Sequence, residues 1–232
     1  VGTAVAGGAL QTVSGGRIGA ELWLAVHEAG ARASLRALDD LGVLAALGMP
    51  SPFDDALAAQ AEALLPADGR RDVLRMAIAL RPGARDQRAA AAALTDVTDS
   101  LEFTREQAGA VLAAASGANE LAELLVEMTG GAGFGELEGS SVEKVAIAAA
   151  IAGPRSERAL ATAQAWFETQ RHVKLEIDGN DLLAAGVRAG PEVGARLRQA
   201  LRRKREGIAE NREQELRAAL DGDVEERRSI ER

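Results

Sequence analysis

The sequence predicts an all-α protein, built as a multi-helix, bundle-like body of short helices. Alanine is abundant and aromatic residues make up only 3% of the 232 residues, so side chains that favour β-strands are sparse. Apolar side chains recur at helical spacing, as at Ile18, Leu22 and Val26. The hydrophobic share of 47% and the charged share of 27% are ordinary for a folded globular chain. We therefore expect packed helices.

The composition also restricts the environment of the chain. The longest apolar runs, such as residues 145–152, fall well short of the ~20 residues needed to cross a bilayer. The chain has no cysteine, which excludes disulfides and thiolate metal sites. We expect a cytoplasmic protein with no membrane partner.

Capping residues, prolines and glycines place the helices of the first 130 residues. Ser14 can cap a helix that starts near Arg17, and Gly30 breaks it. Thr104 and Gln107 have the spacing of a capping box. The predicted helices cover residues 17–29, 32–41, 52–66, 68–80, 84–97, 104–115 and 119–128.

A glycine-rich stretch separates these helices from the rest of the chain. Residues 130–139 contain five glycines, which predicts a loop and a boundary between two helical parts. Residues 173–178 are too short and isolated for a sheet and are expected to be an extended loop. Further helices are predicted at residues 141–151, 155–172, 181–185, 191–205 and 209–220.

The net charge of −8 argues at first against a nucleic-acid partner, but the charges are unevenly distributed. Residues 1–187 carry 15 basic and 25 acidic side chains, whereas residues 188–217 carry nine basic and five acidic ones. Phosphate binding responds to charge within about a Debye length, ~10 Å, more than to the total. The sequence therefore predicts a local basic band near the C-terminus of an acidic protein.

The strongest candidate site in that band is a helix–hairpin–helix stretch at residues 177–201. Its second helix opens on Gly190 and Pro191, and free amides in the first turn of a helix can hold a phosphate. Gly190 and Gly194 have no side chain that would block close approach. The basic residues that follow are Arg196, Arg198, Arg202, Arg203, Lys204 and Arg205. The alternative is an ordinary hairpin with a solvated basic face, and Glu192 beside the helix start favours that alternative.

A second basic cluster lies in the first half of the chain. Its members are Arg70, Arg71, Arg75, Arg81, Arg85 and Arg88. If this cluster is functional, Arg70, Arg71 and Arg75 contact RNA, and the two clusters clamp one RNA backbone. The alternative is a solvated helix face with ion pairs between residues one turn apart.

Both ends of the chain resemble one family. Residues 175–220 are similar to the tail of class II tRNA nucleotidyltransferases (CCA-adding enzymes) and related bacterial poly(A) polymerases. That tail carries Gly-x-Asp-Leu, a Gly, Gly-Pro-x-x-Gly, a basic helix and Glu-x-x-Leu. The matching residues here are Gly179, Asp181, Leu182, Gly186, Gly190, Pro191, Gly194, Glu213 and Leu216. The family's Ser-x-x-Arg-Ile-x-x-Glu-Leu neck segment is matched by Ser14, Arg17, Ile18, Glu21 and Leu22.

The resemblance implies three segments and places the chemistry elsewhere. The segments are neck-like helices at residues 1–50, a helical body at 51–130, and a helical body with the basic tail at 131–232. The family's catalytic nucleotidyltransferase head, with a Gly-Ser loop and an Asp-x-Asp pair, is absent from this chain. Mg and ATP or CTP are therefore implied for the head, and no cofactor for this chain. The adjacent pairs Asp39–Asp40 and Asp54–Asp55 lack that loop, and neighbouring side chains on a helix diverge.

Our leading hypothesis is an RNA-binding helical region of a tRNA nucleotidyltransferase or poly(A) polymerase, with tRNA as the partner. In the family, this region holds the acceptor and T-arm backbone while the RNA 3′ end reaches the head, which adds nucleotides. The competing hypothesis is a helical protein–protein interaction module without RNA binding. It predicts an exposed apolar groove and partners that are insensitive to salt.

Overall fold

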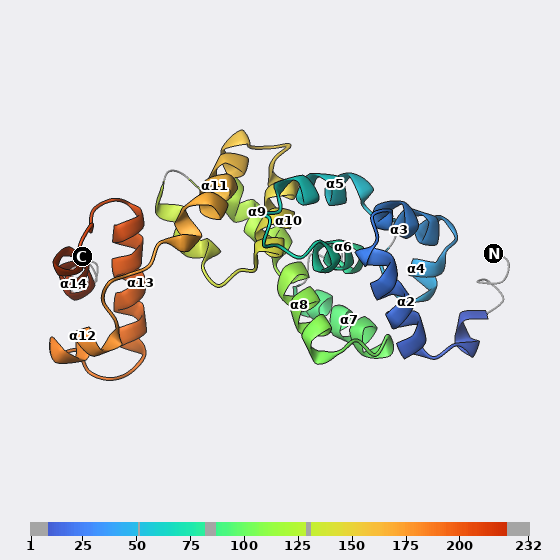
Figure 1. Ribbon diagram of the computed structural model, residues 1–232, viewed down its shortest axis with the longest axis horizontal. Helices are drawn as coiled ribbons and strands as arrows, with labels where there is room; N and C mark the ends of the chain where they lie inside the picture. Colours follow the sequence, from blue (N-terminus) through green and yellow to red (C-terminus); the bar gives the residue numbers. More distant parts are fainter. Residues whose placement is uncertain (1–8, 51, 82–86, 129–130, 222–232) are drawn as a thin grey trace. The chain divides into compact units, whose positions relative to one another are not determined.

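The computed structural model describes residues 9–50, 52–81, 87–128 and 131–221, and those ranges contain helices but no strand (Figure 1). The predicted all-α class is confirmed. The α-helices are α2 (Gly15–His27), α3 (Ala31–Asp40), α4 (Val43–Ala46), α5 (Asp55–Leu64), α6 (Arg71–Leu80), α7 (Gln87–Ser100), α8 (Arg105–Ala115), α9 (Ala118–Glu127), α10 (Val142–Ala152), α11 (Glu157–Glu168), α12 (Gly179–Ala184), α13 (Pro191–Arg205) and α14 (Arg212–Leu220). Short 3-10 helices occur at η1 (Ala9–Thr12), η2 (Gly131–Leu137) and η3 (Gln170–His172).

Side-chain caps begin several helices where the sequence places them. Ser14 Oγ accepts a hydrogen bond from the backbone amide of Arg17 at 3.4 Å, so α2 begins at its predicted cap. Thr104 and Gln107 form the predicted reciprocal capping box at the start of α8. Asp178 accepts hydrogen bonds from two backbone amides at the start of α12. These caps satisfy amides that have no partner inside their own helix.

The helices form two compact units, which do not follow the three consecutive segments that the resemblance implies. Unit 1 combines the chain up to residue 126 with residues 139–163, and unit 2 combines residues 127–138 with the chain from residue 164. The reason is α10, which is apolar on nearly all sides and has to be covered on all sides. It packs against α5, α6 and α8, which returns residues 139–163 to unit 1.

Unit 1 holds α2 in place through two glycines that have no room for a side chain. A Cβ atom on Gly15 would lie 1.8 Å from the carbonyl oxygen of Ser100. A Cβ atom on Gly19 would lie 2.1 Å from the carbonyl oxygen of Leu101. The backbone of α2 therefore lies directly against the end of α7, an approach that only glycine allows.

One segment, residues 105–127, is long and apolar enough to cross a membrane by length and composition alone. In the structure it is broken into α8 and α9 by a turn at Ser116 and Gly117, where Gly117 has a φ of +71°. Val111 of α8 and Leu125 of α9 are fully buried inside unit 1. This segment therefore supplies part of the packed interior.

In unit 2, the helices α12, α13 and α14 pack around a small hydrophobic core of their own (Figure 1). Its buried members are Ile177, Leu182, Ala200 and Ala219. Residues 173–178, which lead into α12, are irregular, as predicted. The predicted loop at residues 130–139 is partly wrong, because residues 131–137 form η2. Leu137 is fully buried there, and η2 contacts α13.

Candidate nucleic-acid interface

The predicted phosphate-binding start of α13 is exposed and has no side-chain cap. Gly190 precedes the helix with a φ of +152°, a conformation that residues with a Cβ atom rarely adopt. Pro191 takes the first helical position, where a missing N–H costs nothing. Glu192 is ion-paired with Arg196 at 2.8 Å, which compensates the negative charge beside this helix start.

Arg196 ties α13 to α14 and does not face solvent. The side chain is buried, and its Nη1 atom donates to the carbonyl oxygens of Ala219 and Leu220 at 3.0 and 3.1 Å. These carbonyls end α14 and have no acceptor role within that helix. We therefore correct the prediction and remove Arg196 from the RNA-binding set, because its donors are used inside unit 2.

Lys204 is also a structural residue. Its Nζ atom lies 2.5 Å from Oε1 of Glu215, whose side chain is 0% exposed. The other carboxylate oxygen accepts hydrogen bonds from the backbone amides of Glu176 and Ile177 at 2.7 and 3.2 Å. Burial by itself raises the pKa of Glu215, but these hydrogen bonds outweigh burial and hold that pKa below its usual value. The hydrogen bond to Glu215 raises the pKa of Lys204. Lys204 therefore also leaves the RNA-binding set.

Arg198 and Arg202 remain as candidate contacts on α13. They lie one helical turn apart and are exposed, and within the described ranges neither side chain has a hydrogen bond or an ion pair. Arg203 is half-buried, and its Nη1 atom lies 3.9 Å from Glu206. A Cβ atom on Gly194 would lie 3.5 Å from the Arg198 guanidinium, which is an ordinary van der Waals contact, so this position does not require glycine. The candidate RNA contacts on α13 are therefore reduced to Arg198 and Arg202, with Arg203 beside them.

Both arginines line a cavity of about 270 Å³ between α13 and η2, inside unit 2. The other lining residues are Gly135, Glu136, Glu138, Ala195, Gln199 and Arg205. Arg205 pairs with Glu138 at 3.4 Å and donates to the backbone carbonyl of Gln170 at 3.2 Å, so it fixes that wall of the cavity. The two glutamates were not among the predicted site residues. They belong to the glycine-rich stretch, and only the packing of η2 on α13 brings them to the arginines.

Arg75, from the second predicted cluster, lies in the interior of unit 1. The Nε atom donates to Glu62 at 2.6 Å, and Nη1 donates to the carbonyl oxygens of Val26 and Glu28 at 2.7 and 3.2 Å. The side chain is only 10% exposed. Arg75 joins α2, α5 and α6 from inside, so it is the third predicted residue that we remove from the RNA-binding set.

The remaining members of that cluster do not form a continuous basic face. Arg70 is neutralised by Asp72 at 2.9 Å and by Glu106 at 3.3 Å. Arg81 is half-buried and donates a hydrogen bond to the side-chain oxygen of Asn119 at 2.7 Å. Desolvation by burial lowers the pKa of Arg81. Arg71 is exposed at the start of α6. The side chains of Arg85 and Arg88 lie outside the described residues. The hypothesis of two clusters that clamp one RNA therefore loses most of its support.

The adjacent aspartates have structural partners. Asp39 accepts a hydrogen bond from the backbone amide of Phe53 at 2.8 Å. Asp54 caps α5, and Asp55 pairs with Arg32 at 3.0 Å. Within the ranges that the structure describes, no group of three or more histidine, aspartate or glutamate side chains is placed to hold a metal ion.

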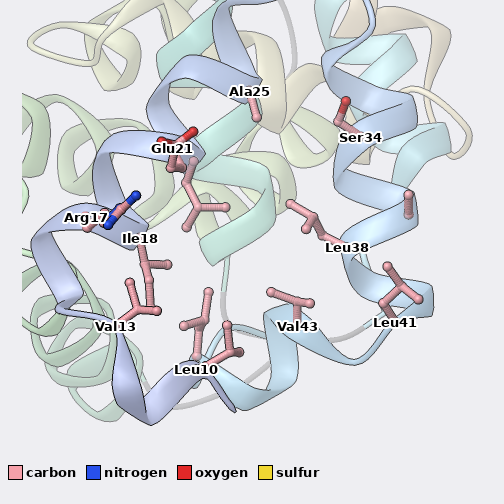
Figure 2. A pocket seen from close by; sticks show the side chains of 13 residues that line it. Leu10, Val13, Arg17, Ile18, Glu21, Ala25, Ser34, Leu38, Leu41 and Val43 are labelled. Carbon is pink, nitrogen blue, oxygen red and sulfur yellow. The ribbon is translucent and has the colours of Figure 1, made fainter. Parts of the chain in front are cut away.

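An apolar groove of about 560 Å³ lies in unit 1 between η1, α2, α3 and α4. Figure 2 shows Val13 and Ile18 on one side and Leu38, Leu41 and Val43 on the other, with their side chains directed into the gap. Val13 is 39% exposed and Leu41 is 37% exposed, so the groove is open to solvent. An exposed apolar groove is the feature that the protein-interaction hypothesis predicts.

The helical fold of this chain is similar to that of part of the solved CCA-adding enzymes. Thermotoga maritima CCA-adding enzyme complexed with tRNA matches with a TM-score of 0.71 and 21% identity, over 95% of this chain and 54% of that chain. A CCA-adding enzyme complexed with CTP matches with a TM-score of 0.72 and 20% identity, over 95% of this chain and 53% of that chain. The fold implied by the sequence resemblance is thereby confirmed, and this chain spans about half the length of the structures it matches. The sequence matches no protein-family model and no curated protein.

Proposed function

We propose that this chain is the RNA-binding helical region of a cytoplasmic tRNA nucleotidyltransferase. It holds the RNA backbone while another part of the enzyme extends the 3′ end. In this proposal Mg and ATP or CTP bind to that other part. Holding a substrate in position lowers the entropic cost of the reaction, so this region contributes to rate without touching the reacting atoms.

The observation that carries the proposal is the pair Arg198 and Arg202. They are exposed on α13, free of partners in the described ranges, and border a cavity. Guanidinium groups are well suited to phosphate because they present a planar fork of donors. A fold shared with an enzyme that was solved in complex with tRNA adds support.

A binding titration with tRNA tests the proposal. The wild-type chain should bind at low salt, and reversing both charges with Arg198→Glu and Arg202→Glu should weaken binding by at least about tenfold. The control is Arg105→Glu with Arg158→Glu, which makes the same change of net charge at exposed arginines of unit 1. Absence of binding at low salt, or equal loss in both double variants, would overturn the proposal.

The apolar groove favours protein binding as a second function. We propose as its occupant the nucleotidyltransferase part of the enzyme, since the matched structures are about twice as long as this chain. Apolar docking is insensitive to salt. Binding of the separately produced nucleotidyltransferase part should therefore persist in about 1 M salt. Leu41→Asp in the groove should abolish it. Leu24→Asp, at a leucine that is 62% exposed on α2 outside the groove, should not. Binding that fails in salt, or survives Leu41→Asp, contradicts this assignment.

A further inference from the structure

The cavity between α13 and η2 has walls of opposite charge. Arg198 and Arg202 line it from α13, and Glu136 and Glu138 line it from the η2 side. Glu138 is held by Arg205 at 3.4 Å. Glu136 is exposed and, within the described ranges, has no hydrogen bond or ion pair through its side chain. Arginines and a glutamate that share a cavity without pairing leave both charges available to a ligand.

A bare anion does not suit both walls. Phosphate would be attracted by the arginines, but the carboxylate of Glu136 on the η2 side, unpaired in the described part of the chain, would repel it. The complementary ligand carries a negative group for the arginines and a hydrogen-bond donor for the carboxylates, because an ionised carboxylate only accepts. The volume of about 270 Å³ is at the lower limit for small-molecule sites, so the ligand is one small unit.

A single ribonucleotide within an RNA strand meets these requirements. Its phosphate oxygens accept from guanidinium groups, and its 2′-hydroxyl can donate to a carboxylate. A deoxyribonucleotide lacks that donor. We propose that this cavity seats one ribonucleotide of the bound RNA, with the phosphate on Arg198 and Arg202 and the 2′-hydroxyl donating to Glu136 or Glu138. The cavity therefore distinguishes RNA from strands without a 2′-hydroxyl, an inference that rests on the proposed function.

The experiment compares one RNA hairpin with the same hairpin carrying 2′-fluoro groups in place of the 2′-hydroxyls. Fluorine preserves the A-form sugar conformation but cannot donate a hydrogen bond, so the comparison isolates the donor from helix shape. A hydrogen bond to a charged acceptor predicts about tenfold weaker binding of the fluorinated hairpin by the wild-type chain. The double variant with Glu136→Ala and Glu138→Ala should bind both hairpins with equal affinity.

The control variant is Glu213→Ala, at an exposed glutamate of α14 that is absent from the cavity lining. It should keep the preference of the wild-type chain for the hydroxyl-bearing hairpin. If the wild-type chain binds both hairpins equally, or if the double variant retains the preference, the assignment of the cavity is wrong while RNA binding itself stands. If the wild-type chain binds neither hairpin at low salt, the proposed function fails as well.

Discussion

Lys204 of α13 and Glu215 of α14 form a hydrogen-bonded ion pair in the interior of unit 2, with Nζ 2.5 Å from Oε1. Glu215 also accepts hydrogen bonds from the backbone amides of Glu176 and Ile177, which precede α12. One carboxylate thus joins three segments of the tail. It lies within the stretch that resembles the family's Gly-Pro-x-x-Gly and Glu-x-x-Leu pattern, so part of that stretch stabilises the hairpin that presents Arg198 and Arg202.

Replacement of Glu215 by Ala should lower the free energy of unfolding of unit 2 by about 3 kcal/mol. The reason is that Lys204, only 19% exposed, and two backbone amides would lose their acceptor. Urea unfolding followed by circular dichroism measures the change. Glu213→Ala, at a side chain that is 84% exposed, should change the free energy of unfolding by less than about 0.5 kcal/mol. Equal midpoints for the two variants would show that the pair does not stabilise the tail.

The same pair predicts a pH dependence of stability. Since the pKa of Glu215 is lowered by folding, its contribution is complete above the unfolded value of about 4.3 and is lost as the pH falls below it. Since the pKa of Lys204 is raised, its contribution is complete below about 10.4 and is lost as the pH rises through the folded value. The difference between the urea midpoints of wild type and Glu215→Gln should therefore shrink as the pH is lowered from 7 to about 3. A constant difference from pH 7 to acid would contradict this.

Gly19 should not tolerate a methyl group. Ala at this position would place Cβ 2.1 Å from the carbonyl oxygen of Leu101, and the backbone cannot move away without separating α2 from the end of α7. We expect a loss of about 2 kcal/mol in thermal or urea unfolding. Gly109 in α8 is the matched control, because a Cβ atom there would meet nothing within 4 Å. Gly109→Ala should instead gain up to about 1 kcal/mol from helix propensity. Comparable losses in both would refute the close approach.

Arg75→Met should destabilise unit 1 by about 3 kcal/mol, because the partly buried Glu62 would lose its nearer cation and keep Arg32 at 3.9 Å, and two carbonyl oxygens would lose their Arg75 donor. RNA affinity, measured well below the unfolding temperature, should stay within about twofold of wild type. Arg71→Gln, at an exposed position, should leave stability unchanged within about 0.5 kcal/mol. A stable Arg75→Met variant with weakened RNA binding would restore Arg75 to the interface.

RNA affinity should depend on salt through the two exposed arginines of α13. Each phosphate contact contributes about one unit to the slope of log affinity against log salt. Arg198→Gln and Arg202→Gln together should therefore reduce the slope by about two. Arg217→Gln provides the comparison, because this exposed arginine of α14 is already paired with Glu213. An unchanged slope in the double variant would mean that these arginines do not contact phosphate.

Several elements were predictable because their causes are local in the chain. The cap at Ser14 and the capping box at Thr104 need only residues three positions away, and both were placed correctly. The basic band near the C-terminus also follows from counting charges. Which basic side chains are free does not follow from counting, because the six basic candidates on α13 look alike until α14 and η2 are packed against them.

The all-α class, the positions of most helices, the resemblance to CCA-adding enzymes and the location of positive charge could all be predicted from the residues alone. The internal positions of Arg75, Arg196 and Lys204 became apparent only from the packed structure. It alone brought Glu136 from the glycine-rich stretch to the cavity beside Arg198. The two groups of features differ in the distance along the chain over which their causes act. Helix propensity and capping act over a few residues, whereas burial of a charge depends on which distant backbone carbonyl or carboxylate lies opposite it.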